Sequence, residues 1–481
     1  MENNEIIPNV LAERYATRQV KEPFSELGKN KAERELWVAV MKGQRELGVD
    51  IPAEDIVSYE RAVGDIDLEL IKQLESEMRH DVNAKIKAFN IAAGMDRSGK
   101  QHAHKRLTSR DLTDNVEQMQ NIRTARIILG KYVSVLRHML DKCRLYEPIE
   151  LTARTHHQPA QPTLLGRRFS MWTEELTLHI PTFERFIEDY PLRGIKGPVG
   201  TQMDMLSLLG SKEKVEILEK KVAEHLGFKR TLNATGQVYP RSLDYQLVSN
   251  LALLSAACSN FALGMRLMSG YELVTEGFKE GQVGSSAMPH KMNTRTSERI
   301  WSLSQLIKMY ADGASRISGE TWEEGDVSCS ALRRVVLPDS IFASDGVCEA
   351  TLTVLNEMGV YPVVISREVD RYLPFLATSE ILGAAIDKGM GRQDAHDLIK
   401  KHAKGVALDM REKGLAVNNL AKLLGDDERF NLSEQDVQKI LDDKTVFIGN
   451  ARNQINTIYN LGSEIISRHP EEAKYEPQPI L

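Results

Sequence analysis

Apolar residues recur at helical spacing along most of the chain, and long amphipathic segments dominate the pattern. The clearest segment covers about 241–273, where apolar side chains follow each other at spacings of four and three residues. Its seam consists of Leu247, Leu251, Leu254, Cys258, Phe261, Met265 and Met268. Long helices are also predicted over 110–145, 163–188, 295–318 and 328–358. Strand patterns are nearly absent from the sequence, which therefore predicts an all-α fold built around a bundle of long helices.

Shorter helical segments flank these long ones on both sides. The pattern predicts an N-terminal helical domain over 1–112, a central long-helix domain over 113–364 and a C-terminal helical domain over 365–481. A segment with several turn-forming residues, 147–163, is expected to be a loop. The long helices would leave wide apolar faces exposed on a single subunit. We therefore expect the bundle to be shared in a homo-oligomer.

Composition narrows the class of protein. The formal net charge of −6 over 481 residues does not favour nucleic acid or an anionic membrane as a partner. The four cysteines are widely spaced, so we expect no zinc site. Residues 245–265 carry no charge, but their scattered polar side chains favour a buried helix over a membrane-spanning one. The acidic N-terminus has no apolar signal segment, and we expect a cytoplasmic protein.

Polar chemistry is concentrated in 281–299, whose sequence is GQVGSSAMPHKMNTRTSER. Two glycines and a proline predict a loop over 281–294, followed by the start of a long helix. Backbone N–H groups of the Gly-Ser-Ser turn can converge on an oxyanion, while Lys291 adds a positive charge and Asn293 a neutral donor. The pattern is typical of an anion site. The alternative is a solvated surface loop that leads into a helix.

Four other loops gather imidazole, basic and hydroxyl side chains, namely 79–81, 102–109, 154–161 and 196–202. Loops at the ends of long helices can meet in space although they are far apart in the sequence. Taken singly, a histidine such as His80 or His156 is more often a structural residue held by a hydrogen bond. The adjacent His156 and His157 lack the further ligands that a metal site needs, so we expect no metal.

The stretch Gly284-Ser-Ser-Ala-Met-Pro-His-Lys-Met-Asn293 resembles the signature loop of the fumarase/aspartase superfamily. Other motifs resemble the adenylosuccinate lyase family within it, namely Arg79-His80-Asp81, Thr108-Ser109, Thr155-His156, Lys196 to Gln202 and Leu373 to Thr378. The resemblance implies a three-domain, all-α fold in a homotetramer whose active sites are each built from three subunits. It also implies small-molecule purine nucleotide substrates and no cofactor.

The implied activity is a β-elimination that splits a C–N bond and releases fumarate. The family substrates are adenylosuccinate, which gives AMP, and succinyl-aminoimidazole carboxamide ribotide (SAICAR), which gives the free carboxamide ribotide (AICAR). Removing a proton beside a carboxylate builds a doubly charged aci-carboxylate, which needs donors and cations already in place. The alternatives are another lyase of the superfamily, such as argininosuccinate lyase, and a non-catalytic helical scaffold.

The resemblance also implies residue roles. Ser285 is the expected general base, and His156 is the acid that protonates the leaving nitrogen, oriented by Glu298. The expected catalytic residues are Ser285, His156, Lys291, Glu298 and His80. The expected substrate-binding residues are Arg14, Tyr15, Arg79, Asp81, His104, Thr108, Ser109, Gln202, Ser286, Met288, Asn293, Arg299, Ser330 and Arg334.

Two positions depart from the family pattern. Thr294 stands where the signature loop usually ends in proline. Gly325 stands where an arginine commonly lies, five residues before the serine equivalent to Ser330. We therefore expect one phosphate contact to be missing or to be supplied by another side chain, with Arg106 and Arg110 as candidates.

Overall fold

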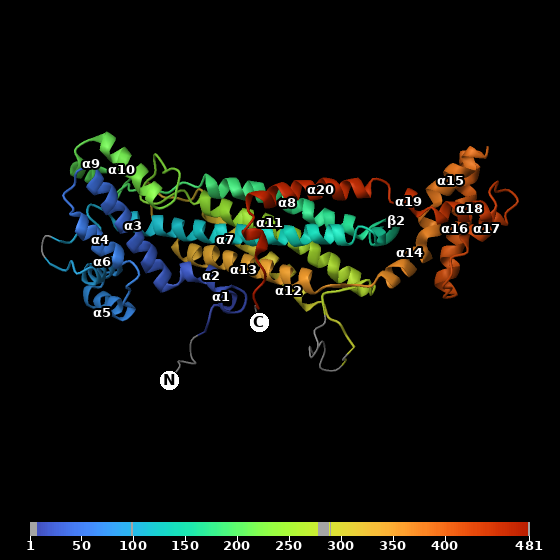
Figure 1. Cartoon of the computed structure of the whole chain (residues 1–481), viewed down its shortest axis with the longest axis horizontal. Helices are drawn as coiled ribbons and strands as arrows, with labels where there is room; N and C mark the ends of the chain where they lie inside the picture. The colour runs from blue at the N-terminus through green and yellow to red at the C-terminus, as the bar shows by residue number, and fades with distance from the viewer. Residues whose placement is uncertain (1–6, 98–99, 278–287, 289, 480–481) are drawn as a thin grey trace.

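Helices dominate the computed structural model, which describes residues 7–97, 100–277, 288 and 290–479. Long helices run side by side along the longest axis and form a central bundle (Figure 1). They are α7 (Ser109–Leu145), α8 (Leu165–Glu188), α11 (Ser242–Gly270), α12 (Arg295–Ile317), α13 (Ser330–Glu357) and α20 (Ala451–Arg468). The prediction of an all-α fold around long helices is confirmed. The ends of the five predicted long helices differ from the observed ones by at most three residues.

The predicted seam of α11 lies at the centre of this bundle. It runs from Leu247 to Met268, and none of its seven side chains is more than 3% exposed. Spacings of three and four residues return to the same side of a helix, and α11 packs against α8, α12 and α13. This helix is long and apolar enough to cross a membrane, but most of its apolar stretch is buried inside the protein.

A helical region lies at each end of the bundle (Figure 1). One end is formed by α3 (Glu26–Glu46), α4 (Ala53–Arg61), α5 (Leu68–Met78), α6 (Asp81–Ala92), α9 (Met203–Leu209) and α10 (Lys212–His225). Ahead of α3 in the chain come α1 (Val10–Arg14), α2 (Arg18–Lys21) and the 3₁₀-helix η1 (Glu22–Phe24). Both α1 and α2 pack against α13, so the N-terminal segment lies along the bundle.

The other end is formed by α14 (Pro362–Leu376), α15 (Thr378–Asp387), α16 (Arg392–Glu412), α17 (Leu420–Gly425), α18 (Glu434–Asp442) and α19 (Lys444–Phe447). This region has a hydrophobic core of its own, from Leu373 to Leu441. The chain then returns to the bundle, where α20 packs on α7 and α8 and the 3₁₀-helix η2 (Glu472–Lys474) packs on α7. The predicted domains remain a prediction, but the last part of 365–481 shares the core of the bundle.

The segment 147–163 is not the irregular loop that we expected. It contains an antiparallel hairpin of β1 (Glu150–Thr155) and β2 (Gln158–Leu164), with a bulge between Ala153 and Arg154. Pro159 and Pro162 hide this strand in the sequence, and a two-stranded hairpin tolerates them because both of its strands are edges. A second small sheet pairs β3 (Val274–Thr275) with β4 (Gly359–Val360).

Candidate active site

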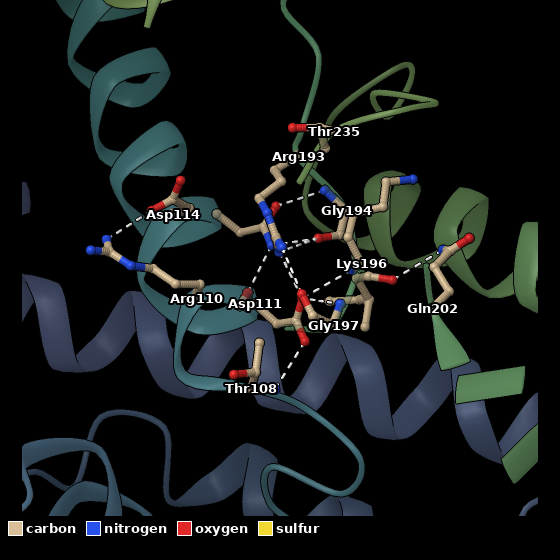
Figure 2. A network of polar contacts seen from close by, with 12 residues as sticks. Thr108, Arg110, Asp111, Asp114, Arg193, Gly194, Lys196, Gly197, Gln202 and Thr235 are labelled. Atoms are coloured by element: carbon tan, nitrogen blue, oxygen red, sulfur yellow. Dashed lines mark hydrogen bonds and ion pairs between the residues drawn. The ribbon is translucent and has the colours of Figure 1, made fainter. Parts of the chain in front are cut away.

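Asp111 organises the loops around the first turn of α7 (Figure 2). Its carboxylate is fully buried, and Oδ1 accepts hydrogen bonds from Arg193 Nη1 at 2.6 Å and from the backbone N–H groups of Lys196 and Gly197, both at 2.9 Å. Oδ2 accepts the backbone N–H of Thr108 at 2.9 Å, which completes a capping box at the start of the helix. One carboxylate therefore fixes the start of α7 relative to the loop that precedes α9.

Gln202 ends this loop and is held by it. Its backbone N–H donates to Lys196 O, and its side-chain Nε2 donates to another carbonyl of the loop, both at 3.0 Å. Gly200 has a φ of 89°, and a Cβ there would lie 2.2 Å from Thr235 O, so only glycine fits. Lys196 is buried and donates to Glu219 Oε2 at 2.5 Å. Lys196 therefore fixes the loop through its contact with Glu219. The side chain of Gln202 is partly exposed.

His104 and His80 differ in environment. Burial lowers the pKa of His104 to about 4, against the opposing effect of the Asp111 charge. Trp37 Nε1 donates to His104 Nδ1 at 3.1 Å, so the neutral ring carries its proton on Nε2 and can donate it to a ligand. His80 is the N-cap of α6, where its Nδ1 accepts the backbone N–H of Asn83 at 3.3 Å.

Strained backbone is concentrated at expected site residues. Eight non-glycine residues in the described part of the chain have a positive φ. Four of them are the expected site residues Arg79, His104, His156 and Gln202, whose φ angles lie between 49° and 64°. Such angles are unfavourable for residues with a Cβ and persist where the surroundings impose them. Their positions agree with a functional role for these loops.

A buried ion network holds the N-terminal segment that carries Arg14 and Tyr15. The backbone N–H of Thr17 donates to Asp345 Oδ2 at 2.6 Å, and Lys131 Nζ donates to Thr17 Oγ1 at 2.9 Å. Lys131 also forms an ion pair with Asp345, and all three side chains are at most 4% exposed. Buried charges need such partners. The network therefore fixes the segment on α13.

The N-terminal segment, packed on α13, places Tyr15 close to Arg299, and both are expected nucleotide contacts. Arg299 of α12 lies with its Cζ 5.8 Å from the centre of the Tyr15 ring, within the range of a cation–π contact. Ser330 is the first residue of α13, and Arg334 follows it by about one turn. Arg299 and Ser330 are partly buried, whereas Arg14 and Arg334 are exposed.

The backbone explains the glycine at position 325. Gly325 has a φ of 142°, and an added Cβ would lie 3.1 Å from Gln237 Cβ, so an arginine would be strained there. The two expected substitutes already have carboxylate partners. Arg110 Nη1 lies 3.1 Å from Asp114 Oδ1, and the Arg106 guanidinium lies 4.0 Å from the carboxylate of Asp204. Their role as replacements for the missing arginine is untested.

Ser285 and Ser286 of the signature loop lie outside the described residues. Met288, Lys291 and Glu298 are exposed, and Asn293 is partly buried. Within one chain Lys291 therefore presents its charge to solvent.

The first turn of α12, which follows the signature loop, is capped by a residue that the sequence did not indicate. The Glu276 carboxylate accepts the backbone N–H groups of Thr296 at 2.8 Å and Ser297 at 2.9 Å, and the Ser297 hydroxyl at 3.0 Å. Thr294 is the N-cap by position but makes no side-chain cap bond. Glu276 therefore satisfies the free N–H groups of the helix from the other end of the loop, and α12 begins one residue after Thr294.

Within one chain His156 lies at the opposite end of the bundle from His80. It forms the turn of the β1–β2 hairpin with His157, and φ angles of 49° and 64° match a type I′ turn. The hairpin packs against α14 at one end of the bundle, whereas α6, which begins just after His80, lies at the other end (Figure 1). The 37 residues of α7 alone span about 55 Å between the two regions. No contact joins His156 to Glu298 among the described residues.

Two family profiles match the chain. One, described as Lyase, covers residues 15–307, and the other, described as Adenylosuccinate lyase C-terminus, covers residues 374–458. The chain is 31% identical to the adenylosuccinate lyase of Saccharomyces cerevisiae over 92% of both chains. It is 33% identical to that of Schistosoma mansoni over 89% of both chains. The chain belongs to the adenylosuccinate lyase family.

Solved structures support the same fold for this adenylosuccinate lyase family member. The 3-carboxy-cis,cis-muconate lactonizing enzyme of Pseudomonas putida has a TM-score of 0.80 and 17% sequence identity, covering 95% of this chain and 99% of that one. A fumarate lyase from Mesorhizobium sp. BNC1 has a TM-score of 0.77 at the same identity, covering 93% of this chain and 98% of that one. At this identity the likeness shows the fold alone.

Two residues that organise the site of this family member were missed in the sequence. Asp111 had a usable signal, because a Thr followed three residues later by an acidic residue is typical of a capping box. Glu276 had none, since it caps a helix that begins about twenty residues later in the chain.

Proposed function

We propose that this chain is an adenylosuccinate lyase that releases fumarate from adenylosuccinate and from SAICAR. Identity of 31–33% to adenylosuccinate lyases over about nine-tenths of the chain is the observation that carries the proposal. The lyase profile spans the signature loop, and the C-terminal profile is specific to this family. The substrates are accordingly small purine nucleotides.

The elimination needs a base, an acid and a stabilised dianion. Ser285 removes the proton beside the carboxylate, and Lys291 and Asn293 stabilise the aci-carboxylate that forms. His156 protonates the departing nitrogen, and Glu298 sets its tautomer. The neutral His104, with its proton on Nε2, donates a hydrogen bond to the substrate and does not act as an acid near neutral pH, in keeping with its pKa of about 4.

We also propose that the protein is a homotetramer whose active sites are shared between subunits. The separation of His156 from the His80 region by the length of α7 supports this arrangement, since the distance far exceeds any substrate of this class. Neighbouring subunits that pack antiparallel along the bundle would bring the two ends together.

The first experiment follows adenylosuccinate conversion by ultraviolet absorbance, with Ser285→Ala and a control variant, Ser467→Ala, measured in parallel. Ser467 is exposed and lies on α20, so its loss leaves the signature loop unchanged. We expect turnover by the wild type and Ser467→Ala, and none by Ser285→Ala. Turnover of argininosuccinate alone would assign another lyase activity, and no turnover of any of these substrates would favour a scaffold. An active Ser285→Ala would remove Ser285 from its role.

Mixing two inactive variants tests the shared site. If Ser285 and His156 of one site come from different subunits, an equal mixture of Ser285→Ala and His156→Asn subunits regains about one quarter of the wild-type activity after reassembly. If both residues came from the same subunit, the mixture would stay inactive. The test therefore separates sharing between subunits from the identity of the reaction.

A further inference from the structure

A pocket of about 470 Å³ lies between the N-terminal segment, α7 and α13. Its volume falls in the range of small-molecule sites. The residues that line it are Ala12, Lys21, Phe24, Ser25, Lys29, Glu117, Gln120, Asn121, Arg333, Arg334, Leu337, Pro338 and Phe342. Apart from Arg334, none of them is among the residues that we place in the active site.

The lining carries an excess of positive charge. Four cationic side chains, Lys21, Lys29, Arg333 and Arg334, face one carboxylate, Glu117, which gives a balance of +3. Arg333 is already bound to Glu117 at 2.7 Å. Among the residues that the structure describes, the other three cations form no ion pair, and Lys21 and Lys29 are partly buried. Lys29 also helps to lower the pKa of the Glu117 carboxyl, but the net charge of the lining stays positive and favours an anion.

Asn121 is a second, independent indication that the pocket binds a ligand. Its side chain is only 1% exposed, and in the described structure its Nδ2 has no hydrogen-bond partner. Buried donors are nearly always satisfied, so an unpaired one at the wall of a pocket indicates that a ligand or water supplies the acceptor. An oxygen atom of an anion bound by the cations would be a suitable acceptor.

Part of the lining is apolar. The rings of Phe24 and Phe342 meet edge to face with their centroids 5.6 Å apart, and Leu337 and Pro338 lie beside them on α13. This surface suits a flat apolar group rather than a small inorganic ion. A dianionic phosphoryl group fits the three cations that form no ion pair better than a carboxylate does, because its charge is larger and its oxygens are more numerous.

We propose that this pocket binds a small organic phosphate with a ring, its phosphoryl group on Lys21, Lys29 and Arg334 and its ring against Phe24. The binding itself does not depend on the proposed lyase activity. One consequence does rest on that function: Arg334 is an expected nucleotide contact, so an occupied pocket should raise the KM for adenylosuccinate and leave kcat unchanged.

Calorimetric titration of the full-length protein with phenyl phosphate tests the proposal, with benzoate and inorganic phosphate as comparison probes. We expect phenyl phosphate to bind most tightly. Lys29→Met should weaken its binding by about tenfold, the loss expected for one charge-assisted hydrogen bond. Lys31→Met is the matched control, because this exposed lysine of α3 lies outside the pocket and should leave the affinity within about twofold.

Asn121→Leu provides a second variant, which removes the unpaired donor and should also weaken phenyl phosphate binding. If it failed to fold, Lys29→Met would decide alone, because that side chain is partly exposed. Equal affinity of the wild type and Lys29→Met would overturn the proposal, and so would tighter binding of benzoate or no binding at all. Lyase activity measured on the same samples keeps a failure of the proposed function separate from a failure of the pocket.

Discussion

Glu276 and Ser297 are joined by two hydrogen bonds across the base of the signature loop. Glu276 Oε2 accepts the backbone N–H of Ser297 at 2.9 Å and its hydroxyl at 3.0 Å. Because the two residues stand at the two ends of this loop, one carboxylate both caps α12 and holds the ends of the loop together. A loop that carries catalytic groups needs ends at fixed positions if those groups are to reach a substrate reproducibly.

Replacing Glu276 tests this arrangement. Glu276→Ala leaves the first N–H groups of α12 without an acceptor and should lower the free energy of unfolding by about 1–2 kcal/mol. Lyase turnover should fall more strongly, by about tenfold, because the loop loses its anchor. Glu320→Ala, an exposed change beyond the far end of α12, is the control for urea unfolding and kinetics. A Glu276→Ala variant with wild-type turnover would show that the loop is positioned by other contacts.

Asp111 should be essential for stability. Asp111→Asn removes the charge from a carboxylate that accepts four hydrogen bonds and leaves the buried Arg193 without its counter-ion. Breaking such a pair costs about 3–5 kcal/mol of unfolding free energy. Asp141→Asn, on the exposed side of the same helix, should cost less than about 1 kcal/mol. Similar denaturant midpoints for the two variants would contradict the role of Asp111.

His104 predicts a pH dependence of stability. Its pKa is about 4 in the folded protein because of burial, below the ordinary value of 6.5 that applies to the unfolded chain. Between these values the unfolded chain binds more protons, so this contribution to stability is complete above about pH 6.5 and is lost as the pH falls towards 4. The loss amounts to about 3 kcal/mol at most. Unfolding curves of His104→Gln should depend less steeply on pH in this window, and equal slopes would contradict the prediction.

The two turn histidines should differ sharply in their effect on catalysis. His156→Asn and His157→Asn both place a residue that tolerates a positive φ in the same turn, so each should preserve the hairpin. His156→Asn should lower kcat by about 10²–10⁴-fold, the usual contribution of a general acid. His157→Asn loses only the contact with the Tyr271 hydroxyl and should stay within a few-fold of the wild type. The opposite order would make His157 the acid.

The helices could be predicted because each long one has a continuous apolar side, as the seam from Leu247 to Met268 illustrates. The hairpin could not, since Pro159 and Pro162 break the alternation that marks a strand. The packing of α20 on the bundle could not be predicted from the sequence either, because the pattern of an amphipathic helix does not show which surface it covers.

The expected site residues came from motif resemblance, and the structure adds how they are held. Tyr15 and Arg299 meet within one chain, which no local pattern indicated. The roles of Ser285, His156 and Lys291 remain predictions, because no contact among the described residues tests them. The same holds for the tetramer and for the cytoplasm as compartment.

α7 determines how far apart the elements at its two ends lie. This helix fixes the distance between the Thr108 region and the hairpin that carries His156, and each added turn would move one relative to the other by about 5.4 Å. Insertions of a few residues should therefore be harmless in the surface loops of the C-terminal helices, for example at 413–419, which connect elements without setting such a distance. Inside α7, whose buried side chains lie along its whole length, the same insertion would rotate one part of the helix relative to the other and turn core side chains towards solvent, so we expect the subunit itself not to fold.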